Sequence, residues 1–242
     1  MTAKQSTTKQ AKTKQVATKR VAAKRVATKR VAAKRIAARP MNVHVVIDRS
    51  GSMQSIRDDA IGGFNTFLID TKGAGQKWWV WLFDTQGIDL VQDGVASSKV
   101  EKLSASSYVP RAGTPLYDAV GAAIAKAKEV RKTKLNILMV LTDGQENSSR
   151  EWSAKAVKDE LTRLADEENW QVIFVAVGAE AWDETARFDM GVVIRNTRSG
   201  RSMQKAYEGV AQASMDYAFQ GTPKMAEWDI DDDGEARGPG AV

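Results

Sequence analysis

Three polar segments of the chain carry side-chain oxygens of the kind that bind hard cations. They are residues 48–53 (DRSGSM), residues 111–119 (RAGTPLYDA) and residues 142–147 (TDGQEN). Alternate positions of an extended loop point to one side, so Asp48, Ser50 and Ser52 can converge on one ion. Mg²⁺ takes about six hard oxygen ligands in octahedral geometry. These residue types therefore suit coordination of a divalent cation, provided that the fold brings the three segments together.

The sequence between and around these segments alternates between strand and helix patterns. Short runs of β-branched and aromatic residues predict strands over residues 42–48, 77–84, 135–141, 170–177 and 192–194, with a hairpin partner over residues 87–91. Helical spacing of apolar residues predicts helices over residues 54–71, 115–130, 152–168, 179–188 and 203–218. This alternation indicates an α/β fold with a doubly wound, mostly parallel sheet, helices on both faces and one antiparallel edge strand.

Such a sheet gives the three polar segments a common location. In open α/β sheets, ligands bind outside the carboxyl ends of the strands, where the strand order reverses. Two of the polar segments directly follow a predicted strand, and the third precedes a predicted helix. We therefore expect all three to lie at one rim of the sheet.

The three segments together resemble the metal-ion-dependent adhesion site of the von Willebrand factor type A (vWA) family. The matching residues are Asp48-x-Ser50-x-Ser52, Thr114 and Asp143, and VVIDRSGSM, GFNTFL, GTPLYDAV and LTDGQEN are similar to the small intracellular bacterial and phage members. The resemblance spans about residues 41–200 and implies a Rossmann-like vWA fold with one Mg²⁺ or Mn²⁺ held by these five residues. It also implies that Asp48 and Asp143 act directly or through water, and that a partner protein's exposed Asp or Glu supplies the last ligand.

Each of these residues also has an ordinary structural explanation. Ser52 can cap the first helix, and Thr114 before Pro115 fits an N-cap followed by proline at the first helical position. Asp143 begins a common type of turn. Capping and turn formation do not require all five residues together, so their combination favours the metal site. For Asp118, two roles are open: a hydrogen bond supporting the site, or compensation of the helix dipole.

The first 40 residues form a basic repeat with 13 Lys and Arg and no Asp or Glu. Its five-residue period advances about 500° around an α-helix, so its branched residues form no apolar stripe, and we expect a disordered arm. Its composition resembles the tails of histone H1-like and nucleoid proteins. Nucleic acid, DNA or RNA, is the expected partner of residues 1–39; a solvated extension and an organellar transit peptide are the alternatives. The expected contacts are Lys19, Arg20, Lys24, Arg25, Lys29, Arg30, Lys34 and Arg35.

The rest of the chain has a different charge and a different expected organisation. Residues 41–242 contain 23 Lys and Arg against 30 Asp and Glu, which excludes a uniformly basic domain. We expect a vWA-like domain over residues 41–220 and a disordered acidic tail over residues 221–242. The apolar runs are far shorter than the roughly 20 residues of a membrane helix, and no signal peptide is recognisable. These features lead us to expect no membrane association and a cytoplasmic location.

A binding module is the function that these features favour. The chain has no cysteine and one histidine, His44, which excludes thiolate nucleophiles and sites built from several histidines. No nucleophile–base pair or phosphate loop is apparent, so we do not expect an enzyme. The alternatives are a nucleoid-like structural protein and an accessory subunit of a chelatase-like or AAA+ ATPase complex. We expect His44 to be a hydrogen-bonded structural residue, and Trp78, Trp79 and Trp81 to lie in the core.

Overall fold

The computed structural model describes residues 41–73, 75–130, 135–167, 170–188, 191–197, 199–220, 226–232 and 236–237. The chain divides into two units, Met1–Ala38 and Arg39–Val242, and all described residues belong to the second unit. The predicted basic arm, with its eight nucleic-acid contact residues, lies outside the described residues.

The described elements follow the predicted alternation closely. The strands are β1 (Met41–Asp48), β2 (Lys77–Asp84), β3 (Gly87–Ala96), β4 (Leu135–Thr142), β5 (Trp170–Val177), β6 (Val192–Asn196), β7 (Ala226–Ile230) and β8 (Ala236–Arg237). The helices are the 3-10 helix η1 (Gly51–Ile56), α2 (Arg57–Thr71), α3 (Leu116–Glu129), α4 (Ala154–Glu167), α5 (Ala179–Ala186) and α6 (Gly200–Gln220).

One sheet contains all of these strands, in the order β3-β2-β1-β4-β5-β6-β7-β8. Strands β2, β1, β4, β5, β6 and β7 are parallel to their neighbours in this series, whereas β3 pairs antiparallel with β2 at one edge. The predicted α/β class and the antiparallel edge strand are thereby confirmed. A second antiparallel pair, β7 with β8, closes the other edge. The order reverses between β1 and β4, which makes the gap between their carboxyl ends the expected ligand position.

The prediction of a disordered tail over residues 221–242 is wrong for Ala226–Ile230. These residues form β7, which pairs with β6 from Val192↔Ala226 to Asn196↔Ile230. Ile230 is buried, and its carbonyl oxygen accepts a hydrogen bond from Ser202 Oγ at 3.2 Å. Because the edge of a strand offers unpaired N–H and C=O groups, this short segment pairs with β6 despite its acidic composition.

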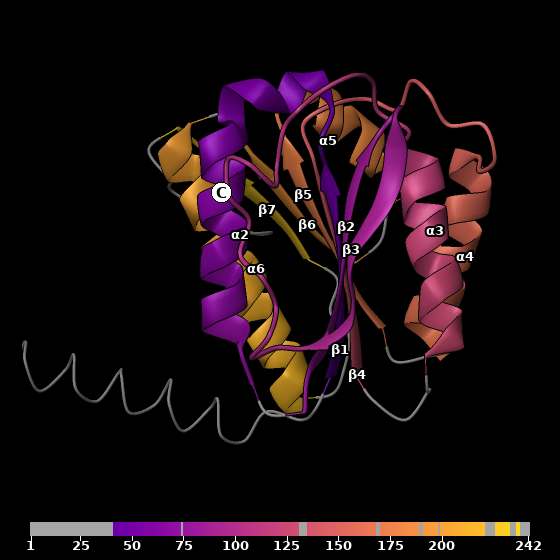
Figure 1. The fold of residues 1–242 in the computed structure, drawn as a ribbon, viewed down its shortest axis with the longest axis vertical. Coiled ribbons are helices and arrows are strands. Elements are labelled where there is room, and N and C mark those ends of the chain that lie inside the picture. The colour runs from indigo at the N-terminus through magenta and orange to yellow at the C-terminus, as the bar shows by residue number, and fades with distance from the viewer. Residues whose placement is uncertain are drawn as a thin grey trace, which may run out of the picture. The chain divides into compact units, whose positions relative to one another are not determined.

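Helices cover both faces of the sheet, α2 and α6 on one and α3 and α4 on the other (Figure 1). Beneath α2, the Trp78 ring lies 5.4 Å from the ring of Phe67. Beneath α3 and α4, Trp81 joins the buried cluster that contains Val120 and Leu161. Trp79 is also buried, so the prediction that the three tryptophans lie in the core is confirmed. None of the described helices has the length and apolar character needed to cross a bilayer.

His44 is a buried structural residue, but within the described part of the chain it does not form the expected hydrogen bond. The ring is fully buried in β1 and stacks on Trp79 with 4.6 Å between ring centroids. Among the described residues, neither ring nitrogen has a hydrogen-bond partner. Burial, with a smaller contribution from Lys126, lowers the pKa of His44 to about 3. The imidazole is therefore neutral at physiological pH and is held by stacking.

Candidate metal centre

The predicted site residues lie at the carboxyl ends of β1 and β4. Asp48 is the last residue of β1, and Thr142, the last of β4, directly precedes Asp143. These two strands are parallel neighbours at the point where the strand order reverses. Segments that are 91 residues apart in the sequence thus meet at the position where α/β sheets bind ligands.

Asp48 is held rigidly at this position. Its Oδ1 accepts a hydrogen bond from the backbone N–H of Ser50 at 2.7 Å, and its Oδ2 accepts one from Thr142 Oγ1 at 2.7 Å. The side chain is fully buried, and this burial raises its pKa to about 7, against the lowering effect of the Thr142 and Ser50 hydrogen bonds and with a small raising contribution from Asp143. A nearby cation favours the charged form of a carboxyl group, so a bound metal ion would keep Asp48 ionised.

Hydrogen bonds also connect Ser52 of the first segment with Ser50 and with Asp143 of the third segment. Ser52 Oγ donates to Asp143 Oδ1 at 2.6 Å, and the Oγ atoms of Ser50 and Ser52 lie 3.1 Å apart. Asp143 itself is fully buried. The Ser52 hydroxyl therefore lies within hydrogen-bond distance of both the Ser50 hydroxyl and the Asp143 carboxylate.

Thr114 lies beside this group. Its backbone N–H donates to Asn147 Oδ1 at 2.9 Å, and its carbonyl oxygen accepts from the backbone N–H of Asn147 at 3.2 Å, which joins the second segment to the third. A Cβ atom added at Gly144 would lie 3.6 Å from both Ser52 Oγ and Thr114 Oγ1. The absence of a side chain at Gly144 therefore leaves space beside two of the predicted ligands.

This set of donors fits a hard divalent cation. The cluster contains three hydroxyl oxygens and two carboxylates, the ligand types that Mg²⁺ and Mn²⁺ accept. No group of three or more His, Cys, Asp or Glu side chains with metal-binding geometry occurs within the described part of the chain. A metal ion at this rim would consequently depend on the serine and threonine hydroxyls as well as the two aspartates.

Sequence reasoning missed a charged network that supports the rim. Asp84, the buried last residue of β2, accepts from Arg49 Nε at 2.6 Å and from Arg111 Nε at 2.9 Å. Arg49 also contacts Asp89 at 2.7 Å. The backbone N–H of Arg111 donates to the carbonyl oxygen of Arg49 at 2.8 Å, so the network fastens the second segment to the first. Part of this network could have been predicted from the sequence, because Asp84, like Asp48, is the last residue of its strand.

Two further residues hold the loops in place. The Tyr108 hydroxyl donates to the backbone carbonyl oxygen of Asp48. The Asp118 carboxylate accepts from the backbone N–H groups of Arg150, Glu151 and Trp152 at 2.8, 3.0 and 2.8 Å. Asp118 thus anchors the segment that follows the third polar loop, a support role that depends on direct hydrogen bonds to the chain.

Comparison with known proteins identifies similar folds and no similar sequence family. No protein-family model matches the chain, and no curated protein matches it. The solved structures that resemble it include proximal thread matrix protein 1 from the mussel byssus (TM-score 0.49, 17% identity), the pilus adhesin SpaC from Lactobacillus rhamnosus GG in an open conformation (TM-score 0.50, 12% identity) and the SpRpn10 VWA domain (TM-score 0.49, 10% identity).

The extent of these matches differs between the three structures. They cover 75%, 73% and 70% of this chain, and 47%, 30% and 95% of the mussel protein, the adhesin and the VWA domain. The chain therefore spans about half of the mussel protein and less than a third of the adhesin. At these identities the likeness concerns the fold alone. The described part of the chain has a doubly wound α/β fold, and the solved structures similar to it include a vWA domain.

Proposed function

We propose that this chain is a vWA-type protein-interaction module that binds one Mg²⁺ or Mn²⁺ through Asp48, Ser50, Ser52, Thr114 and Asp143. The observation that carries the proposal is the 2.6 Å hydrogen bond between Ser52 Oγ and Asp143 Oδ1, which joins two distant segments of the predicted ligand set. We assign the chain a binding role and no catalytic role.

The binding chemistry follows from the charges of the ligands. Two carboxylates and three neutral hydroxyls leave little excess negative charge around a divalent cation. When bound, the ion supplies an electrophilic position for a carboxylate oxygen of a partner protein's exposed Asp or Glu. The chain's own contribution is to keep the ligands in place: Thr142 and the Ser50 N–H orient the Asp48 carboxylate, and Asn147 positions Thr114.

Calorimetric titration with Mg²⁺ and Mn²⁺ tests the metal site. We expect one ion per chain in the wild type, and no binding by Asp48→Ala, with the circular dichroism spectrum retained. The matched control is Asp58→Ala, which removes an exposed carboxylate from the first turn of α2 and is expected to bind normally. Unchanged binding by Asp48→Ala would place the ion elsewhere and refute the proposal. If Asp48→Ala abolishes metal binding as expected, capture of a partner protein that EDTA reverses would test the interaction role.

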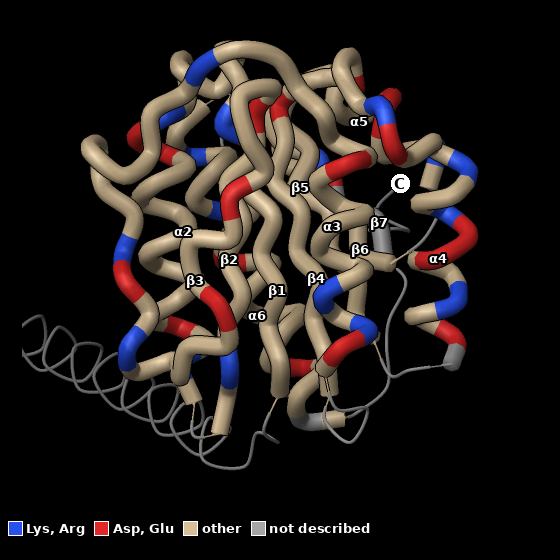
Figure 2. Tube along the Cα trace, turned by 45° about the vertical axis from the view of Figure 1, so that its right-hand side comes forward, with Lys and Arg blue, Asp and Glu red and all other residues tan. Residues whose placement is uncertain are grey.

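A second candidate function concerns residues 1–39, for which we propose non-specific binding of DNA or RNA. The observation that favours it is the 13 positive charges without a negative one. In the described elements, by contrast, acidic and basic residues are interspersed (Figure 2). Clustered cations release the counterions of a polyanion on binding, independent of base sequence. Deletion of residues 1–39 is expected to abolish the salt-dependent retardation of duplex DNA in a gel, and equal retardation without them would refute this role.

A further inference from the structure

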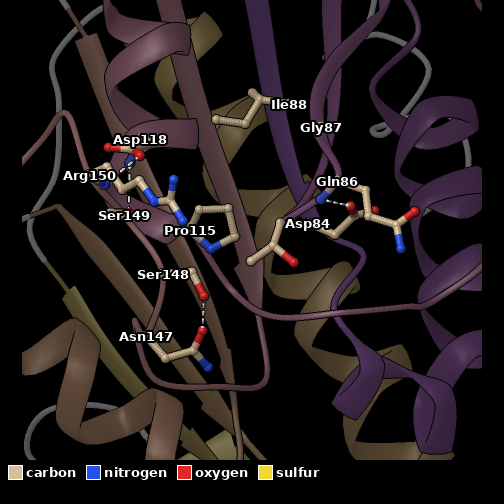
Figure 3. Close-up of a pocket in the computed structure, with 11 residues that line it drawn as sticks. Asp84, Gln86, Gly87, Ile88, Pro115, Asp118, Asn147, Ser148, Ser149 and Arg150 are labelled. Atoms are coloured by element: carbon tan, nitrogen blue, oxygen red, sulfur yellow. Dashed lines mark hydrogen bonds between the residues drawn. The ribbon is translucent and has the colours of Figure 1, made fainter.

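An open groove of about 660 Å³ adjoins the candidate metal centre. One wall is the β2–β3 turn, residues 84–88, and the other is residues 147–150; Pro115 lies between them, and Asp118 lies beside Arg150 (Figure 3). Pro115 directly follows Thr114, so the groove begins one residue from a predicted metal ligand. Ligand pockets measure roughly 300–1,000 Å³, and this groove has room for a short peptide segment.

Both carboxylates that line the groove are already compensated. Asp84 is buried between two guanidinium groups and also accepts from the backbone N–H of Gln86 at 2.7 Å. Asp118 is occupied by three backbone N–H groups. Neither carboxylate therefore attracts a cationic side chain strongly.

Arg150 is the groove residue whose charge is available to a ligand. Its side chain is exposed and lies beside Pro115 (Figure 3). Its backbone N–H is fixed by Asp118, whereas none of the ion pairs in the described part of the chain involves its guanidinium. A planar guanidinium binds a carboxylate with two parallel hydrogen bonds. The groove thus presents, close to the site where a partner carboxylate is proposed to bind, one positive charge that forms no ion pair with a described residue.

We propose that this groove seats the residues next to the partner's metal-bound Asp or Glu, and that Arg150 binds a second acidic side chain of the same segment. The inference rests on the proposed metal-dependent function and specifies its partner: an extended peptide carrying two acidic residues a few positions apart. The hydroxyl and amide groups of Thr85, Gln86 and Ser148 supply hydrogen bonds for its backbone.

Synthetic peptides test this assignment on the full chain with Mn²⁺ bound. The probes are acetylated, amidated glycine-rich peptides with one Asp and, one to four positions away, Glu, Gln or Lys. At the best spacing we expect the Glu peptide to bind about three- to fivefold more tightly than its Gln counterpart, as for an exposed ion pair. The preference should vanish in Arg150→Ala, reverse in Arg150→Glu, and persist in Arg57→Ala, which removes an arginine of α2 outside the groove.

The outcomes separate the two proposals. Binding that requires Mn²⁺ but is equal for the Glu and Gln peptides at every spacing overturns the role of Arg150 and leaves the metal-dependent function standing. Binding that is unaffected by EDTA or by Asp48→Ala refutes the metal-dependent function. Failure of all peptides to bind, or tighter binding of a Lys peptide than of the Glu peptide, overturns the groove assignment.

Discussion

Thr142→Val is the substitution that examines the metal centre most directly, because it removes one hydroxyl and keeps the shape of the side chain. Thr142 Oγ1 donates to Asp48 Oδ2 at 2.7 Å, and both side chains are fully buried. Hydrogen bonds to charged groups contribute about 1.5–3 kcal/mol. Loss of a partner that orients a metal ligand typically lowers metal affinity by about 10- to 100-fold. We therefore expect Mn²⁺ affinity to fall by that factor.

Titration calorimetry measures this affinity, and urea unfolding with and without Mn²⁺ measures the coupled stability. The wild type should gain about 2.7 kcal/mol when the free ion is at 100 times its dissociation constant, and Thr142→Val should gain clearly less at the same concentration. Thr71→Val is the matched control, because Thr71 is also buried and donates to the Phe67 carbonyl oxygen at 2.7 Å in α2. It should lose stability but keep its Mn²⁺ affinity. Unchanged affinity in a folded Thr142→Val protein would refute the reasoning.

Three further predictions follow from the same structure and sequence. Folding lowers the pKa of His44 from 6.5 to about 3, so the free energy of unfolding should decrease as the pH falls from 6.5 toward 3, by up to about 1.4 kcal/mol per pH unit. Urea unfolding of His44→Phe at several pH values should lack this contribution to the pH dependence. Gly63→Ala should unfold at lower urea concentration, since its Cβ would lie 1.9 Å from the Tyr207 ring, whereas Gly62→Ala, with nothing within 4 Å, should stabilise α2 by about 0.5–1 kcal/mol; a stable Gly63→Ala would contradict the packing. For residues 1–39, if about half of the 13 charges meet phosphates, log affinity for DNA should fall against log salt with a slope of about −5 to −6, and a slope near zero would exclude counterion release.

The backbone elements were largely predictable because their signals are local. The mostly apolar runs at residues 77–84 and 170–177 predicted β2 and β5 with the bounds that the structure has. Alternation of strands and helices then implied a parallel sheet, and a parallel sheet brings strand carboxyl ends to one rim. The convergence of Asp48, Ser52 and Asp143 could therefore be expected from the positions of their strands.

Only the tertiary structure decided which groups meet across the sheet. Arg49 and Asp84 are 35 residues apart, and nothing in either segment indicates their pairing. His44 was expected to find a hydrogen bond, but the register of β1 on β2 places it against Trp79. The charge of the C-terminal segment suggested disorder, while the open edge of β6 makes a strand of Ala226–Ile230. Periodicity along the chain determines how a segment folds; its partners depend on register and on which edges remain unpaired, and these are properties of the assembled sheet.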